Sequence, residues 1–423
     1  MNTNTELKTK HQQMLELLDE IAHTGKSLGI ILQDTEDEQV DGRTVKVNGK
    51  RLVNFTSCSY LGLELDPRLI AGTIDATTRF GTQFASSRSY LSITLYKEVE
   101  ELLAQIFKMP VALSQTTSLG HISNIPILVG DNDAVIMDIS VHATVQEAVS
   151  LLVERGIHIE RVRHNRMDLL EERIVELSKK YEKIWYMADG VYSMFGDAAP
   201  LDKLKDLLDD NEQFYLYIDD AHGMSWAGEN GAGYVYSKLS YHPKMYFTTS
   251  LAKGFGASGG VLAFPEKSSF HRVHDYGRTF IFSTQLSPPI LGAIRASAKL
   301  HLSNDITLYQ AQLMERILYF NETAKTLGVP LHSDTDTPVR FVALGKPQVG
   351  YNMVTRLMND GIYTSLCVYP SVSYNNTGIR IALTRHHTIE DIHNLLTAIA
   401  RHLPEVLVEC GSSMKEINRY FKL

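Results

Sequence analysis

Segments with a helical spacing of apolar residues alternate with short apolar runs between about residues 66 and 300. Residues 97–107 and 144–155 have the helical pattern, and residues 134–138 and 183–187 are short apolar runs typical of buried strands. Strands that are separated by helices pair in parallel, and the helices cover both faces of the resulting sheet. The alternation therefore predicts an α/β domain with a mostly parallel sheet.

The N-terminal part of the chain has other patterns. Residues 5–25 carry apolar residues at helical spacing on an otherwise polar segment, which predicts a helix that docks on the body of the protein or across a dimer. Residues 42–54 alternate apolar and polar side chains around Asn48 and Gly49, which predicts a hairpin. We expect these elements to form an arm over residues 1–65.

The C-terminal part predicts a smaller α+β domain over residues 301–423, after a large domain over residues 66–300. Its expected elements are helices at residues 308–327 and 351–360 and strands at residues 339–344 and 379–383. A final helix is expected to begin after Thr388, because this hydroxyl is followed three residues later by Asp391, as in a capping box.

Composition excludes several classes of protein. The formal net charge is −8 over 423 residues and no long basic run occurs, so a nucleic-acid partner held through its phosphates is not expected. Cys58, Cys367 and Cys410 are widely spaced and odd in number, which favours neither a disulfide framework nor a metal site. The sequence has no signal-peptide pattern and no run of about 18 apolar residues. We therefore expect a cytoplasmic protein without a transmembrane segment.

Lys253 lies in a segment rich in hydroxyls and glycines, residues 249–260, between the apolar stretches 245–247 and 261–264. An ammonium group in such a place loses hydration and gains no evident carboxylate partner, so a purely structural role explains it poorly. The pattern is typical of a lysine that forms a Schiff base with a carbonyl compound.

Asp219 and His222 follow the apolar run 214–218, which is typical of a buried strand. Open α/β sheets bind their ligands at the carboxyl ends of the strands. A carboxylate there can keep a pyridine nitrogen protonated, which pyridoxal phosphate needs in order to act as an electron sink. Together with Lys253 and a glycine-containing phosphate site, these residues predict pyridoxal 5'-phosphate as the cofactor.

Motif blocks between about residues 54 and 395 occur in one characteristic order. They are residues 54–63, 81–88, 118–124, 138–144, 189–201, 219–233, 249–260, 280–284 and 378–383. In this order the chain resembles the α-oxoamine synthases, which are pyridoxal-phosphate enzymes with the aspartate-aminotransferase fold. The resemblance implies fold type I, with a mostly parallel seven-stranded sheet in the large domain.

The resemblance also implies roles for individual side chains. Lys253 holds the cofactor and later moves a proton, Asp219 contacts the pyridine nitrogen, and His222 contacts the phenolic oxygen of the ring. His142 stacks on the ring and hydrogen-bonds the acyl oxygen, and Ser193 lies near the ring oxygen or the substrate. Capping by Asp219, packing by His142 and a loop role for His222 are the competing interpretations.

The implied phosphate site comprises Ser250 and the backbone amides of Gly120 and His121 at the start of a helix, where unpaired donors favour an anion. In the family, residues like Ser283 and Thr284 reach the same phosphate from the neighbouring subunit. The resemblance therefore implies a homodimer with shared active sites.

Arg380 matches the arginine that binds the substrate carboxylate through a two-pronged contact, and a structural role is the alternative. The implied substrates are an amino acid and an acyl thioester, from acyl-CoA or an acyl carrier protein. Their condensation with loss of carbon dioxide gives an α-aminoketone and a free thiol.

Residues 89–100 depart from the family pattern, because this segment is shorter and has Tyr96 where a histidine is usual. His121 likewise replaces a usual aromatic residue. Three alternatives therefore stay open: an aminotransferase or aldolase-type enzyme on the same fold, an autoinducer-type synthase that uses a long acyl-CoA, and a non-enzymatic family member. The presence of Lys253 argues against the last.

Overall fold

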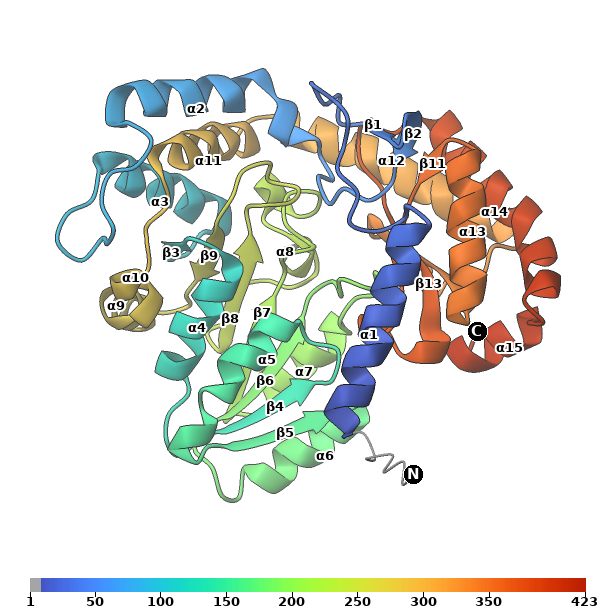
Figure 1. Ribbon diagram of the computed structural model, residues 1–423. Helices are drawn as coiled ribbons and strands as arrows, with labels where there is room; N and C mark the ends of the chain where they lie inside the picture. Colours follow the sequence, from blue (N-terminus) through green and yellow to red (C-terminus); the bar gives the residue numbers. More distant parts are fainter. Residues whose placement is uncertain (1–8) are drawn as a thin grey trace, which may run out of the picture. The chain divides into compact units, whose positions relative to one another are not determined.

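The structure is a computed structural model that describes residues 9–423. These residues form two compact units (Figure 1). We call residues 58–315 the large unit, and residues 316–423 together with the N-terminal residues up to Ser57 the small unit. The three-part division at residues 65 and 300 stays a prediction.

A seven-stranded sheet forms the centre of the large unit, with the strand order β3-β9-β8-β7-β6-β4-β5. The strands are β3 (Val111–Ser114), β4 (Ala134–Asp138), β5 (His158–Val162), β6 (Ile184–Asp189), β7 (Phe214–Asp219), β8 (Met245–Ser250) and β9 (Gly260–Ala263). The five strands from β8 to β5 pair in parallel, and only β9 and β3 at the other edge pair antiparallel. The predicted α/β fold with a mostly parallel seven-stranded sheet is confirmed.

Alternating side chains of each strand enter two separate apolar cores. Trp185 and Met187 of β6 belong to one core, and Ile184 and Tyr186 belong to the other. The first core is covered by α4 (Thr117–Leu128), α5 (Ala143–Ser150), α9 (Lys267–Tyr276) and α10 (Arg278–Phe282). The second includes residues of α2 (Pro67–Phe80), α3 (Thr94–Phe107), α6 (Met167–Leu177), α7 (Leu201–Asp210), α8 (Tyr234–Lys238) and α11 (Pro288–His301). Burial on both faces explains why these strands are continuous apolar runs.

Helices α2 and α11 approach each other through glycines. A Cβ atom on Gly292 would lie 2.1 Å from the carbonyl oxygen of Gly72, so neither position accepts a larger residue without moving a helix. This close contact fixes α11, whose C-terminal half supports two loops of the site described below.

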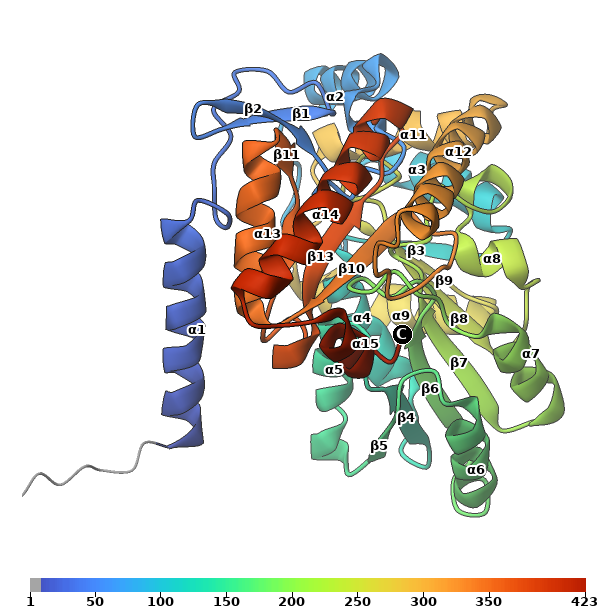
Figure 2. The same ribbon diagram turned by 90° about the vertical axis from the view of Figure 1, so that its right-hand side faces the viewer.

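The small unit contains two three-stranded sheets, with the orders β1-β2-β11 and β10-β13-β12. Their strands are β1 (Thr44–Val47), β2 (Lys50–Asn54), β10 (Val339–Gly345), β11 (Ile362–Tyr363), β12 (Ser365–Cys367) and β13 (Thr377–Ala382). Helices α13 (Pro347–Asn359) and α14 (Ile389–Glu409) pack together beside the second sheet, and α15 (Met414–Phe421) contacts β10 (Figure 2). Helix α12 (Asp305–Thr326) has residues in both units. The hairpin around Asn48 and the capping box of α14 are confirmed.

Long-range contacts join the N-terminal hairpin to the C-terminal part of the small unit. Strand β2 pairs in parallel with β11, the guanidinium of Arg43 lies 2.6 Å from the Asp391 carboxylate, and Phe55 stacks on His387 with ring centroids 4.1 Å apart. None of these partners is close in sequence, so the local pattern that predicted the hairpin could not predict its partners.

Helix α1 (Lys10–Ser27) begins with a capping box between Thr9 and Gln12, and residues 5–8 of the predicted helix lie outside the described residues. Its apolar stripe is largely open, with Met14 38% and Leu15 45% exposed. Docking of this helix stays a prediction. Among the residues that the structure describes, no helix combines the length and the apolar character needed to cross a membrane.

Candidate active site

A cavity of about 280 Å³ lies in the large unit where β6, β7 and β8 end. Asp189, Asp219 and Ser250, the last residues of these strands, all contribute to its wall. The remaining lining residues are Thr116, Thr117, Ser118, His142, Thr144, Val191, Ala221, His222, Ala252, Lys253, Ser258 and Gly259. The structure therefore brings together five of the predicted site residues, namely Lys253, His142, Asp219, His222 and Ser250.

Lys253 is held in a closed loop between β8 and β9. The Leu251 amide donates to the carbonyl of Gly259 at 2.9 Å, and the Gly256 amide donates to the carbonyl of Lys253 at 2.9 Å. Gly256 has φ +76°, and a Cβ atom there would lie 2.5 Å from that of Leu63, so only glycine fits. The loop fixes the backbone of a half-buried lysine that faces the cavity.

Asp219 ends β7 with both carboxylate oxygens hydrogen-bonded. Oδ1 accepts from the Ala221 amide at 2.9 Å, and Oδ2 lies 3.0 Å from His121 Nε2. Burial alone would raise the pKa of Asp219, but the bond from His121 and the charge of Lys253 outweigh it and hold that pKa below its ordinary value. Asp219 is therefore an ionised carboxylate at the cavity wall.

Asp189 lies beside Asp219 on the neighbouring strand β6. Burial and the negative charge of Asp219 raise the pKa of Asp189 well above its ordinary value, although its Oδ1 accepts from the His142 amide at 3.1 Å. Two buried carboxylates this close do not both ionise, so Asp189 keeps its proton and Asp219 carries the charge.

Asp220, the neighbour of Asp219, points away from the cavity into a space lined by glycines. Cβ atoms added to Gly190, Gly223 and Gly233 would lie 2.4, 2.0 and 2.4 Å from its carboxylate oxygens. Burial raises the pKa of Asp220 well above its ordinary value, and its Oδ2 accepts from the Val235 amide at 3.0 Å. The geometry thus distinguishes the two adjacent aspartates.

His142 is the N-cap residue of α5 and lines the cavity. The Thr144 amide donates to His142 Nδ1 at 3.3 Å, so the proton of the neutral ring lies on Nε2. Burial lowers the pKa of His142. The ring is therefore a neutral hydrogen-bond donor.

His222 lies 2.6 Å through Nδ1 from the hydroxyl of Tyr60, a fully buried residue. The carbonyl of His222 also accepts from Trp226 Nε1 at 2.7 Å, which fixes the backbone of the turn after β7. Tyr60 lies within a block that carries the family resemblance, but no pattern in the sequence singles it out. Its role depends on a contact between residues 162 positions apart.

The N-terminus of α4 forms one wall of the cavity. Thr116 caps the helix by accepting from the Leu119 amide at 3.1 Å, and Thr117 and Ser118 supply the first amides of the helix. Helix N-termini bind anions through such amides and through the helix dipole. Ser250 and Ser258 add hydroxyls to the same cavity, which makes this wall suitable for a phosphate.

The predicted pair Gly120 and His121 lies one turn further into α4. The Gly120 amide donates to the carbonyl of Thr116 at 3.0 Å, so it is used inside the helix and does not face an anion. The His121 side chain is fully buried and points to Asp219. The phosphate-binding amides that the geometry favours are those of Thr117 and Ser118.

Residues 50–399 match the family described as aminotransferase class I and II. The chain belongs to this family. It is 30% identical over 358 residues to 8-amino-7-oxononanoate synthase of Symbiobacterium thermophilum, covering 84% of this chain and 89% of that one. It is 31% identical over 386 residues to the enzyme of the same name from Fervidobacterium nodosum, covering 89% and 95%.

The fold of this aminotransferase family member also matches a solved structure. Serine palmitoyltransferase of S. paucimobilis superposes with a TM-score of 0.84 at 23% identity, covering 95% of this chain and 100% of that one. This likeness confirms fold type I, and the curated relatives confirm the predicted α-oxoamine synthase resemblance. The family match and the relatives also confirm the predictions of an acyltransferase-type enzyme and of pyridoxal-phosphate dependence.

Ser283 and Thr284 do not line the main cavity of this family member. They follow α10, and Ser283 Oγ donates to Gln115 Oε1 at 3.2 Å, next to the cap of α4. Their predicted action from a neighbouring subunit stays a prediction. Ser193 lies two residues beyond Val191 in the loop after β6 and is likewise not a lining residue.

Tyr96, the residue that departs from the family pattern, is buried in the second apolar core of the large unit. Its ring lies 4.0 Å from the Arg88 guanidinium, which binds Glu100 through both oxygens at 2.8 and 3.0 Å. Its hydroxyl donates to the Leu286 carbonyl at 3.2 Å. Tyr96 therefore packs against a partly buried ion pair and does not line the main cavity.

Arg380 lies on β13 of the small unit, and its side chain is buried. Its register partners are Phe341 on β10 and Ser365 on β12, so it occupies the middle strand of a three-stranded sheet. Its predicted role in binding a substrate carboxylate stays a prediction.

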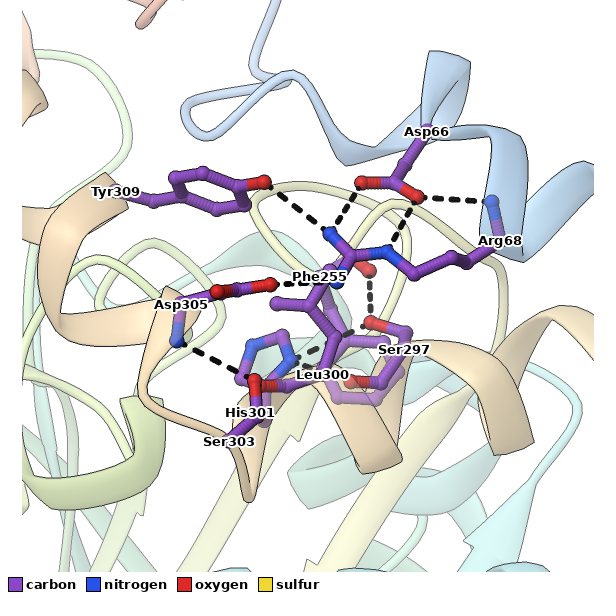
Figure 3. A network of polar contacts seen from close by, with 9 residues as sticks. All are labelled: Asp66, Arg68, Phe255, Ser297, Leu300, His301, Ser303, Asp305 and Tyr309. Atoms are coloured by element: carbon purple, nitrogen blue, oxygen red, sulfur yellow. Dashed lines mark hydrogen bonds and ion pairs between the residues drawn. The ribbon is translucent and has the colours of Figure 1, made fainter.

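Helix α11 supports two loops of the site from behind (Figure 3). Ser297 Oγ donates to the carbonyl of Phe255, two residues after Lys253, at 2.6 Å. His301 stacks on Phe255 with ring centroids 4.5 Å apart, and its Nε2 lies 2.9 Å from Ser225 Oγ in the loop after His222. Burial lowers the pKa of His301 to about 4, so this contact is between neutral groups.

Ion pairs of Arg68 join the starts of helices α2 and α12, close to the contacts of Ser297 and His301 (Figure 3). Arg68 contacts Asp66 at 2.8 Å and Asp305 at 2.6 Å, which joins the start of α2 to the start of α12. The Tyr309 hydroxyl lies 3.1 Å from the same guanidinium. The contacts of Arg68 with Asp305 and Tyr309 join residues 237 and 241 positions apart, so no local motif could predict them.

Proposed function

We propose that this chain is a pyridoxal-phosphate enzyme that condenses an amino acid with an acyl thioester. The reaction releases carbon dioxide and a free thiol and leaves an α-aminoketone. One observation carries the proposal: a single cavity is lined by an amine, an ionised carboxylate, a neutral imidazole and the N-terminus of a helix. The identity to 8-amino-7-oxononanoate synthases supports the same class of reaction.

The residues around the cavity fit pyridoxal phosphate group by group. The amine of Lys253 suits the aldehyde, the Asp219 carboxylate suits the ring nitrogen, and His222 with its Tyr60 partner suits the phenolic oxygen. The amides of residues 117–118 with the Ser250 hydroxyl suit the phosphate. When bound, the cofactor supplies an electron sink for the charge that develops at the α-carbon of the amino acid.

Lys253 and His142 have complementary roles in this proposal. The Lys253 amine would hold the aldehyde of the cofactor, and its Nζ would remove or return the α-proton of the amino acid. His142 is neutral and carries its proton on Nε2, so it donates a hydrogen bond to the acyl oxygen as negative charge builds there. Thr144 fixes this tautomer by occupying Nδ1.

Arg380 is proposed to bind the carboxylate of the amino acid, because a guanidinium offers two parallel donors to a carboxylate. Ser193 is proposed to lie near the ring oxygen or the substrate. Both assignments rest on the family resemblance of the sequence.

We further propose a cytoplasmic homodimer in which Ser283 and Thr284 reach the partner's phosphate site. The three free cysteines among the described residues are compatible with a reducing compartment. Light scattering on the active enzyme is expected to give twice the chain mass of 47.5 kDa. A fully active particle of 47.5 kDa would contradict the shared site.

Thiol release measured over a panel of amino acids and acyl-CoA chain lengths tests the proposed reaction. We expect release that requires both an amino acid and a thioester, with carbon dioxide formed in equal amount. Keto-acid or aldehyde formation from the amino acid without any thioester would instead support a transaminase or an aldolase-type enzyme.

A further inference from the structure

The His121 side chain connects Asp219 to the interior of the large unit. It is fully buried on α4, with Nε2 3.0 Å from Asp219 Oδ2 and Nδ1 2.8 Å from the hydroxyl of Tyr217. Each ring nitrogen of His121 therefore has a partner within hydrogen-bond distance. Sequence analysis predicted only a backbone role for His121, so this side-chain contact is a new feature of the site.

The direction of each hydrogen bond follows from the chemistry of the partners. Asp219 is ionised and can only accept, so His121 must donate from Nε2. The Asn124 amide donates to the Tyr217 oxygen at 3.4 Å, and the same oxygen lies 2.8 Å from His121 Nδ1. Burial raises the pKa of Tyr217, so the phenol keeps its proton. The network therefore places an N–H of the histidine against the carboxylate.

These hydrogen bonds fix the orientation of the Asp219 carboxylate. One oxygen is bound by the Ala221 amide and the other by His121, so the plane of the carboxylate is fixed. A phenylalanine at position 121 would offer no such donor. A hydrogen bond to a charged group is worth more than a neutral one, so loss of the His121 donor is expected to affect Asp219.

We propose that His121 is a positioning residue that keeps Asp219 ionised and oriented toward the ring nitrogen of the cofactor. This inference rests on the proposed function, because it gives a task to the carboxylate. The other ionisable groups that interact with Asp219 are Asp189 on β6, Tyr217 and Asp220 beside it on the chain, His142 before α5 and Lys253 after β8. All of them are retained when only His121 is changed.

His121→Phe tests the proposal, because phenylalanine fills similar space and lacks the donor. Loss of the donor raises the pKa of Asp219, so the carboxylate becomes a stronger base and holds the ring proton more tightly. In enzyme loaded with pyridoxal phosphate labelled at its ring nitrogen, nitrogen NMR is expected to show that proton leaving at a pH about one unit higher than in wild type. We also expect a roughly tenfold lower kcat with little change in KM.

His121→Gln keeps an amide donor and is expected to restore part of the shift, and it replaces His121→Phe if that variant does not fold. Ser123→Ala is the matched control, because Ser123 is a buried residue of α4 that bonds Thr279 at 2.6 Å and does not contact Asp219. It is expected to lower stability without moving the ring-proton transition.

Two negative results are distinguishable. Wild-type protein that binds pyridoxal phosphate, together with a folded His121→Phe variant that has an unchanged transition pH, would overturn the role of His121 alone. Wild-type protein that shows no cofactor absorption after incubation with pyridoxal phosphate would overturn the proposed function, and this inference with it.

Discussion

Two aspartates that are buried at the carboxyl ends of strands in one sheet each bind a histidine, and the two pairs differ in what surrounds the histidine. Asp219 on β7 is bound by His121, whose other nitrogen faces a neutral phenol. Asp138 on β4 is bound by His164 at 2.9 Å, and the other nitrogen of His164 lies 2.6 Å from Asp197.

The two carboxylates determine the charge of His164. Burial opposes a charge on His164, but the bonds to Asp138 and Asp197 outweigh it and raise the pKa of His164 to about 9. A cationic His164 thus lies between two carboxylates that do not line the cavity, whereas Asp219 is a single ionised carboxylate at the cavity wall that faces both His121 and Lys253. The two pairs have the same residue types and differ in the number of acids around the histidine.

Lys253→Ala is expected to have the largest effect on turnover, because Lys253 interacts with Asp219 of the Asp219–His121 pair from the loop after β8. Turnover should fall by at least about 10²–10⁴-fold, since both cofactor attachment and proton transfer are lost. The melting temperature should hardly change, because a half-buried loop side chain contributes little packing. Thiol release and thermal unfolding measure the two quantities. Turnover within about tenfold of wild type would defeat the assignment.

Replacing the two aspartates separately tests the contrast between the pairs. Asp219→Asn should lower turnover strongly and stability little, whereas Asp138→Asn should lower the free energy of unfolding by about 2–4 kcal/mol. Asp138 accepts hydrogen bonds from Ser140 and Asn165 amides at 2.7 and 2.9 Å and faces His164, which explains the structural loss. Urea unfolding and turnover per folded molecule are the measurements. Equal losses of turnover in both variants would remove the distinction.

The charge on His164 makes one part of the stability dependent on pH. Its folded pKa of about 9 lies above the ordinary value of 6.5, so its stabilisation is complete below pH 6.5 and is lost as pH rises through 9. His164→Gln should remove about 2–3 kcal/mol of stability at low pH and flatten the decline. Unfolding measured across this range in wild type and variant checks the sign. A wild-type stability that rises over the same range, relative to His164→Gln, would contradict a cationic His164.

Two buried tyrosines provide the smallest and most closely matched test. The Tyr217 hydroxyl binds His121, and the Tyr186 hydroxyl donates to Asp138 at 3.2 Å. Tyr217→Phe should lower turnover a few-fold, while Tyr186→Phe should cost about 1 kcal/mol of stability and leave turnover per folded molecule unchanged. Steady-state kinetics of both variants at one temperature decide the point, and identical kinetics would show that the phenol does not act through His121.

The buried parts of the fold were the most predictable from sequence. The predicted strand at residues 134–138 agrees with β4, and the segment before Asp219 agrees with β7, because burial on both faces leaves continuous apolar runs. Strand β5 was not predicted, since its sequence includes His158, Glu160 and Arg161 and it lies at the edge of the sheet. Helix α15 after the last expected helix was also missed.

The site residues were predictable only where a sequence motif indicates both the type of residue and its place at the end of a strand. Lys253, Asp219 and His142 line one cavity as the motifs indicated, because each follows the end of a strand of the same sheet. Tyr60 and Asp189 were missed, since their importance depends on packing against residues distant in sequence. The Gly120 amide, which was expected to face a phosphate, bonds the Thr116 carbonyl within α4, because the position of a helix cap depends on its backbone conformation.

Mass spectrometry of the reduced enzyme tests the central claim most directly. Wild-type protein is incubated with pyridoxal phosphate, treated with borohydride to make any lysine linkage permanent, digested and analysed peptide by peptide. The account predicts a single stoichiometric modification on Lys253, lost in Lys253→Ala and retained in His164→Gln. Stoichiometric modification of a different lysine, or none in a folded protein saturated with the cofactor, would contradict it.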